Sequence, residues 1–213
     1  MAEPEPNDAT PFLPERRSLK ALREAAAGCR GCHLHERATQ TVFGEGPRKA
    51  RIVLVGEMAG DREDREGRPF VGPAGRELDR ALEGAGLPRG DVYVTNVVKH
   101  FKFEERGKRR IHQTPRKGEI DACMPWLDTE IKLIRPAGLV ALGATAAKAL
   151  LGPDFRLTHH RGELLESALA PVVAATIHPS AIVRDRDEES RERERAALVS
   201  DLRTVVRAVE EAR

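Results

Sequence analysis

The stretch RIVLVG at residues 51–56 decides the fold. An unbroken apolar run of β-branched residues is typical of a strand buried on both faces. Three similar runs are VYVTNVV at 92–98, GLVALG at 138–143 and PVVAATI at 171–177. Helical patterns lie at 19–27, 74–84, 116–134, 144–151 and 188–210. This alternation predicts an α/β fold: one three-layer α/β/α domain with a central, mostly four-stranded parallel sheet.

Polar residues follow three of these predicted strands. Glu57 follows the first, Lys99 and His100 follow the second, and His178 follows the fourth. In parallel α/β sheets, ligands bind beyond the carboxyl ends of the strands. We therefore expect these side chains to line one cleft. No Walker A motif is present and no Gly-x-Gly-x-x-Gly motif follows a strand, so the sequence disfavours a nucleotide cofactor.

Composition limits the remaining possibilities. With 213 residues the chain suffices for one domain. We expect residues 15–213 to form it and the proline-rich, acidic residues 1–14 to be a disordered tail. The net charge of +2 means that nucleic-acid affinity must come from local patches. No apolar run is long enough to span a bilayer and no signal-like start is present, so we expect a cytoplasmic protein without membrane contact.

The three cysteines suggest a metal site in a reducing compartment. Cys29 and Cys32 form a Cys-x-x-Cys pair, and Cys123 precedes Met-Pro-Trp in a predicted helix. This spacing suits a zinc site, a redox pair or a cluster equally well. Three cysteines need a fourth ligand, and His33 and His35 lie close enough in sequence to compete for that position.

A short basic stretch, KRRIH at 108–112, stands out after the second strand. Between residues 101 and 118 there are seven Lys or Arg and two Glu. Alone, such a stretch is most often a solvated loop with an incidental histidine. A phosphate backbone would also suit it, and the imidazole of His112 could then act on what the phosphates deliver.

Four further segments resemble, in order, the motifs of iron–sulfur uracil-DNA glycosylases. They are GEMAGDRED at 56–64, GRPFVG at 67–72, TNVVK at 95–99 and HPS at 178–180. The KRRIH stretch resembles the insertion of the UdgX class, whose members bond covalently to uracil-containing DNA through its histidine. The resemblance extends from about residue 25 to 207 and implies the uracil-DNA glycosylase fold.

The resemblance also implies a role for each site residue. Phe70 stacks on the extruded uracil, Asn96 reads its edge, and the residue at position 58 lies near the base. His178 stabilises the leaving uracil anion, and His112 bonds to the sugar C1′. Glu57 orients His112, and Asp61 polarises the same region. The DNA contacts implied are Lys108, Arg109, Arg110 and Arg184, the last of these in a loop (181–184) that wedges into the duplex.

For the metal, the resemblance implies a [4Fe-4S] cluster held by Cys29, Cys32, His100 and Cys123. A Cys3His zinc site remains the alternative. One departure is Met58, where UdgX-type members commonly have glutamine; a thioether accepts hydrogen bonds only weakly. The partner we expect is uracil-containing DNA, preferably single-stranded, bound by a monomer.

Three functions therefore follow from the sequence. The first is a uracil-DNA glycosylase that forms a covalent adduct through His112 and acts once. The second is a hydrolytic, turnover iron–sulfur uracil-DNA glycosylase of base excision repair. The third is a metal-stabilised DNA-binding domain without catalysis, which Met58 alone favours.

Overall fold

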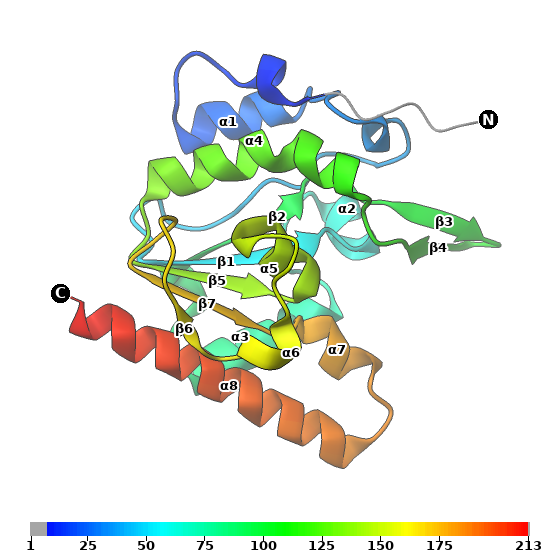
Figure 1. The fold of residues 1–213 in the computed structure, drawn as a ribbon. Coiled ribbons are helices and arrows are strands. Elements are labelled where there is room, and N and C mark those ends of the chain that lie inside the picture. Colours follow the sequence, from blue (N-terminus) through cyan, green and yellow to red (C-terminus); the bar gives the residue numbers. More distant parts are fainter. Residues whose placement is uncertain (1–7, 213) are drawn as a thin grey trace.

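A computed structural model describes residues 8–212, and a five-stranded sheet forms the centre of that part of the chain (Figure 1). Its order is β2-β1-β5-β7-β6. The strands are β1 (Ile52–Met58), β2 (Val92–Val98), β5 (Gly138–Leu142), β6 (Leu164–Leu165) and β7 (Val172–Thr176). The four predicted strands are confirmed and pair in parallel, whereas the short edge strand β6 runs antiparallel and was not predicted.

Strand β1 shows how the sheet is buried on both faces. Val53 and Val55 belong to one apolar core, and Ile52 and Leu54 belong to a second core on the other face. The first face is covered by α4 (Lys117–Ile134) and α5 (Ala144–Leu151), and α1 (Leu19–Ala26) packs on the outer side of α4. The second is covered by α3 (Pro73–Gly84) and α8 (Glu188–Glu211). The predicted three-layer arrangement is thus confirmed.

Shorter elements connect these layers. They are α2 (Asp61–Glu66), α6 (Leu157–His160), α7 (Pro179–Arg184), and the 3-10 turns η1 (Thr10–Phe12), η2 (His33–Glu36) and η3 (Arg89–Asp91). Segment 181–184 is therefore part of helix α7, and its prediction as a loop was wrong. Pro179 at the first turn of α7 has no N–H to lose, which favours a helix start there.

The basic segment forms a β-hairpin instead of the predicted loop. Strands β3 (Phe103–Arg106) and β4 (Arg109–His112) pair antiparallel, with Phe103 opposite His112. The two-residue connection uses Gly107 at φ 60°, a left-handed conformation that glycine adopts without strain. The hairpin forms a separate two-stranded sheet and projects from the domain (Figure 1).

The start of the chain is ordered earlier than predicted. Residues 1–7 of the expected tail lie outside the described residues. From Asp8 onward, however, the chain is packed against the domain: Ala9 is 1% exposed and donates its N–H to the Ala122 carbonyl at 2.9 Å. Phe12 and Leu13 also pack against the core, so this part of the expected tail contacts the domain.

A buried ion pair joins β2 to α4 and fixes the end of β2. Lys99 Nζ lies 2.5 Å from Glu130 Oε2, and both side chains are at most 1% exposed. The ammonium also donates to Thr95 Oγ1 and to the Asn96 carbonyl, each at 2.7 Å. The Tyr93 hydroxyl donates to Glu130 at 2.7 Å. Removing one partner of such a pair typically costs about 3–5 kcal/mol of stability.

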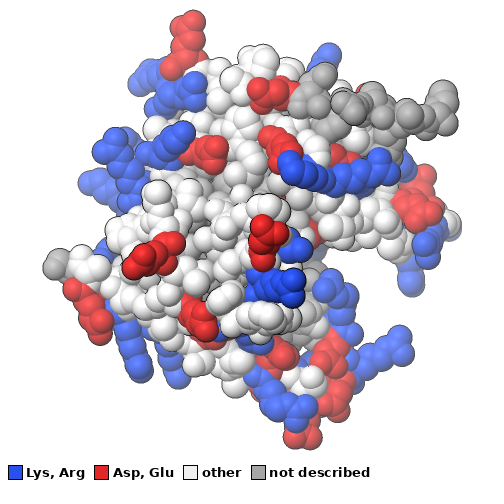
Figure 2. All heavy atoms as spheres, viewed as in Figure 1, with Lys and Arg blue, Asp and Glu red and all other residues white. Residues whose placement is uncertain are grey.

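The surface carries both charges in alternation, as the small net charge requires (Figure 2). Lys and Arg nevertheless occur on both sides of the hollow between the hairpin and the segment joining α7 to α8. Of the helices formed by residues 8–212, none is both long and apolar enough to cross a membrane.

Candidate active site and metal centre

A pocket of about 690 Å³ lies at the carboxyl ends of the parallel strands, where the strand pattern predicted it. It brings together seven of the residues singled out in the sequence: Glu57, Met58, Phe70, Asn96, His112, His178 and Arg184. Lys99 and His100 were expected in the same cleft but do not line it. A larger hollow of about 950 Å³ lies beside residues 135–137 and 167–171, which precede β5 and β7. It contains none of those residues. The smaller pocket is therefore the candidate active site.

Phe70 provides an aromatic wall of this pocket. Its ring lies 5.9 Å from that of His178, with 28° between the planes. Its backbone is left-handed at φ 56°, a strained conformation for a large residue that functional sites often retain. A Cβ atom at Gly75 would lie only 1.8 Å from the Phe70 carbonyl, and one at Gly56 would lie 2.7 Å from the ring. Glycine at both positions is therefore needed to seat Phe70.

Asn96 lies at the end of β2 and is 3% exposed. The position of a Cβ atom at Gly56 lies 2.4 Å from Asn96 Oδ1, so the amide packs directly over the neighbouring strand β1. An amide held there presents both a donor and an acceptor to a planar ligand. The geometry suits recognition of a base edge.

His178 is held in one tautomer by the first turn of α7. The Ser180 N–H donates to His178 Nδ1 at 3.1 Å, so this nitrogen is an acceptor and Nε2 bears the proton. Burial lowers the pKa of His178 to about 4, and the positive potential of Arg184 and His112 adds to the effect. At neutral pH the ring is therefore an uncharged N–H donor.

Glu57 stands between a histidine and a hydroxyl. Its Oε1 lies 3.4 Å from His112 Nε2, and its Oε2 accepts a hydrogen bond from Thr145 Oγ1. Thr145 lies in the first turn of α5 and lines the pocket. Sequence analysis missed Thr145, because a threonine at a helix start usually has only a local role. Thr145 thus orients the Glu57 carboxylate, which in turn contacts His112. Nucleophilic catalysis uses the same arrangement, in which a third group orients the base beside the nucleophile.

His112 reaches the pocket from the hairpin. Its ring centroid lies 6.0 Å from that of Phe101, and its side chain remains 45% exposed. Burial lowers its pKa below the ordinary 6.5, while Glu57 raises it and Arg184 lowers it further. The free imidazole is thus neutral at physiological pH, the form that has a lone pair for attack.

Met58 has a contact that the sequence did not suggest. Its Sδ accepts the Lys102 N–H at 3.2 Å, and Lys102 Nζ is bound to Glu119 Oε1 of α4 at 2.8 Å. Gln113 N–H donates to the Lys102 carbonyl at 3.0 Å. Met58 therefore lines the pocket and also holds the base of the hairpin.

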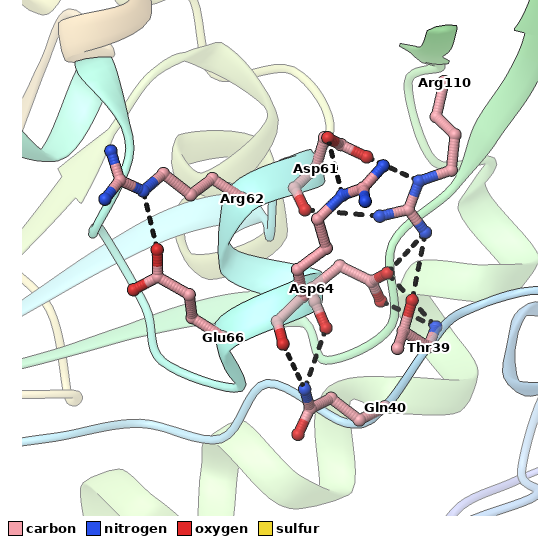
Figure 3. A network of polar contacts seen from close by, with 8 residues as sticks. Thr39, Gln40, Asp61, Arg62, Asp64, Glu66 and Arg110 are labelled. Carbon is pink, nitrogen blue, oxygen red and sulfur yellow. Dashed lines mark hydrogen bonds and ion pairs between the residues drawn. The ribbon is translucent and has the colours of Figure 1, made fainter. Parts of the chain in front are cut away.

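Two residues assigned to catalysis and DNA contact instead bind each other. Arg110 Nε lies 2.5 Å from Asp61 Oδ1, and Arg110 Nη1 lies 2.7 Å from Asp64 Oδ2 (Figure 3). The Arg110 side chain is only 14% exposed. Asp61 also binds Arg65 at 3.1 Å and does not line the pocket. Catalysis by Asp61 and DNA contact by Arg110 are therefore not supported, because both groups already have partners.

The other expected DNA contacts are exposed. Lys108 and Arg109 lie at the tip of the hairpin, and Arg184 lies at the end of α7 beside the pocket. Arg184 Nη1 donates to Ser180 Oγ at 3.0 Å. Val183, next to it, is an exposed apolar residue at 41%. Of these expected DNA contacts, only Arg184 lines the pocket itself.

The three cysteines are buried in one apolar core and form no disulfide. Cys29 Sγ accepts from Trp126 Nε1 at 3.3 Å, and Cys123 Sγ accepts from the Lys99 N–H at 3.3 Å. Burial raises the pKa of Cys123 to about 12, and nearby Cys32 and Cys29 add to this effect. Buried sulfurs that accept N–H bonds are suitable ligands for a metal group that would stabilise them as thiolates.

The candidate fourth ligands lie nearby in the fold. His100 is 5% exposed and its Nε2 lies 3.0 Å from Thr41 Oγ1, while burial lowers its pKa to about 4. His35 bonds to the Cys32 carbonyl through Nδ1 at 2.7 Å, and His33 Nε2 lies 3.3 Å from Glu119. Within residues 8–212, no group of three or more His, Cys, Asp or Glu is placed to hold a metal ion.

Fold and pocket together define the class of protein. A parallel α/β sheet presents an aromatic wall, a buried side-chain amide and a neutral histidine donor at its carboxyl edge. The family model described as the uracil DNA glycosylase superfamily matches residues 43–203. The chain therefore belongs to the uracil-DNA glycosylase superfamily.

Individual relatives refine this assignment. The type-4 uracil-DNA glycosylase of Pyrobaculum aerophilum is 38% identical over 173 residues, which cover 78% of this chain and 85% of the relative. That of Thermotoga maritima is 39% identical over 174 residues, covering 81% and 87%. The type-5 enzyme of P. aerophilum is 33% identical over 153 residues, covering 63% of each. The chain is thus more similar to these type-4 enzymes than to this type-5 enzyme.

Proposed function

We propose that this protein is a UdgX-type uracil-DNA glycosylase, which flips uracil out of DNA, excises it and forms a covalent adduct with the sugar C1′ through His112. One observation carries this proposal. The hairpin places His112 in the same pocket as Phe70, Asn96 and His178, at 3.4 Å from Glu57.

Recognition of the base follows from the pocket walls. Uracil stacks on Phe70, and the Asn96 amide accepts from N3–H and donates to O4. Cytosine has an amino group at position 4 and no proton on N3, so an amide in this orientation cannot satisfy both positions. Lys108, Arg109 and Arg184 hold the backbone around the extruded nucleotide.

Cleavage of the N1–C1′ bond leaves its electron pair on uracil, whose negative charge is shared with O2. The fixed Nε2–H of His178 donates to that oxygen, and a donor aimed at developing charge is a major source of catalysis. The ring is neutral, so it stabilises the anion by hydrogen bonding without first giving up a proton.

The sugar cation is then captured. A ring nitrogen of His112 forms the bond to C1′, and Glu57 accepts the remaining N–H of the resulting imidazolium. Thr145 holds the far oxygen of Glu57 and so keeps the carboxylate turned toward the histidine. Since the product has no ready leaving group, each protein molecule acts once.

For the metal, we propose a [4Fe-4S] cluster held by Cys29, Cys32, His100 and Cys123. The support is three buried free thiols, two of which accept N–H bonds at their sulfurs, and a buried, neutral imidazole close by. A [4Fe-4S] cluster is larger than a single metal ion, so its ligands lie farther apart than the ligands of one ion. The cluster's role would be structural: it ties the N-terminal segment to both ends of the chain region that contains the hairpin.

A second candidate is a hydrolytic uracil-DNA glycosylase, which the names of the type-4 relatives favour. One gel separates the two functions. The protein is incubated with a uracil oligonucleotide and denatured in detergent with heat. A shifted band supports the adduct, whereas an unshifted strand that alkali cleaves supports hydrolysis. Intact free DNA contradicts both.

The pH dependence of adduct formation provides another test. Burial lowers the pKa of His112 below 6.5. Protonation removes the lone pair, so the rate should hold from about pH 8 down to about pH 6.5 and fall only at lower pH. Quenched time courses across this range measure it. A rate that rises as the pH falls would exclude neutral His112 as the nucleophile.

Reversible DNA binding, measured in a His112→Ala background, should depend on salt through the hairpin tip. Replacing Lys108 or Arg109 by glutamine should each reduce the log–log salt slope by about 0.7 on single strands. Lys20→Gln is the matched control, because that side chain is 86% exposed on α1, away from the pocket. An unchanged slope in both tip variants would show that the tip does not touch phosphates.

A further inference from the structure

Arg110 binds several groups of the protein itself, which a residue that only contacts phosphate would not need to do. Its guanidinium binds Asp61 Oδ1 and Asp64 Oδ2, and it also donates to Thr39 Oγ1 at 3.1 Å and to the Asp61 carbonyl at 3.3 Å (Figure 3). Asp64 is fully buried and accepts the Thr39 N–H at 3.0 Å. We call Arg110, Asp61, Asp64 and Thr39 the hairpin clamp.

Aromatic rings complete the clamp from the hairpin side. The Arg110 guanidinium carbon lies 4.9 Å from the Phe103 ring centroid and 5.4 Å from that of Phe101. The two rings stack at 5.2 Å. A planar guanidinium between carboxylates and aromatic faces is held in orientation as well as position. The clamp joins β4 to α2 and to the segment before β1.

His112 depends on this clamp for its place. Residues 110 and 112 lie two apart on strand β4, so their side chains point to the same face. Both contact Phe101, Arg110 at 5.4 Å and His112 at 6.0 Å. A two-stranded hairpin is marginally stable by itself. Its contacts with the domain must therefore determine how firmly His112 faces C1′.

We propose that the hairpin clamp decides the outcome of the reaction, adduct or hydrolysis, by holding His112 in the position that an attacking water would otherwise take. Arg110 is a positioning residue in this scheme. The inference rests on the proposed function, because it presupposes that His112 is the nucleophile.

The two outcomes differ only in what bonds to C1′ after uracil has left as its anion. With the clamp closed, a His112 nitrogen supplies the electron pair and Glu57 accepts the other ring N–H. With the clamp released, the histidine withdraws and a water oxygen forms the bond. The water's proton passes to Glu57, and the product is a free abasic sugar, so the protein can react again.

The experiment measures both products with Arg110→Gln and Arg110→Lys, using Arg106→Gln as the control. Arg106 is exposed on the same hairpin, so its replacement removes a charge without opening the clamp. Lysine keeps the charge but cannot bridge two carboxylates. Denaturing gels measure the amount of adduct, and alkali cleavage measures the amount of abasic strand. The amount of uracil released is expressed per mole of protein.

In both Arg110 variants, we expect adduct formation to slow by about 10- to 100-fold, as displacement of a reacting group predicts. More than one uracil should then be released per protein. Arg106→Gln should behave like the unmodified protein. Asp61→Asn should shift the products in the same direction, which tests the clamp from its other side.

Two results would overturn the inference. One is an unchanged ratio of adduct to abasic strand in the Arg110 variants. The other is equal loss of both products while thermal unfolding matches that of the unmodified protein, since this places Arg110 in cleavage itself. If the unmodified protein forms only abasic strand, the proposed function is wrong, and so is the inference about the clamp. This outcome is distinguishable from the other two because it appears without any substitution.

Discussion

Replacing His112 by alanine is expected to abolish the detergent-stable complex with uracil-containing DNA while leaving the fold unchanged. The side chain is 45% exposed at the end of the hairpin, so its loss opens no cavity in either apolar core. Mass spectrometry of the digested complex checks this, and a crosslink at any other residue would contradict the mechanism.

His112→Ser should do more than remove the adduct. The smaller side chain leaves room for a water at C1′, and Glu57 remains held by Thr145 to orient it. The variant should release uracil repeatedly, and adding Glu57→Gln should suppress the regained turnover. Failure of His112→Ser to excise any uracil, in a folded protein, would show that the histidine is needed for cleavage and not only for capture.

Cys123→Ala is expected to have the largest effect on stability. Cys123 is 4% exposed within α4, and its sulfur receives the Lys99 N–H. If it holds the cluster, its loss removes binding free energy that is also folding free energy, and we expect destabilisation of at least about 4 kcal/mol. Iron and sulfide content, visible absorbance and thermal unfolding measure the effect.

His100→Cys is the matched variant for that experiment, because it exchanges one ligand type for another. It should keep iron and colour. Purified protein should be yellow-brown. A colourless protein with stoichiometric zinc and full activity would replace the cluster by the alternative zinc site.

The strands of the fold could be predicted because burial on both faces leaves a continuous apolar run, as in 51–56. The hairpin could not be, since its outward positions are charged on nearly every residue and show no alternation of apolar and polar side chains. Strand β6 is only two residues long and gives no pattern at all.

The pocket residues were predictable where they follow a predicted strand, as for Glu57 and His178, or lie near the C-terminal end of one, as for Asn96. The partners of Arg110 could not be predicted, because a sequence shows that a guanidinium is present but not which carboxylates the fold brings to it. Asp61 and Asp64 lie 49 and 46 residues away in the chain. Thr145 was missed for a similar reason, since its contact with Glu57 spans 88 residues.

The hairpin is structurally separate from the part of the chain that forms most of the pocket. The residues proposed to bind and release the base lie on β2 (Asn96), in the turn between α2 and α3 (Phe70) and at the start of α7 (His178), whereas the proposed nucleophile His112 lies on a hairpin inserted between β2 and α4. That hairpin shares no strand pairing with the sheet, so it can change in length or composition without altering the order of the strands. Under the proposed function, excision therefore depends on the domain and covalent retention of the DNA depends on a hairpin that could change without rebuilding the sheet.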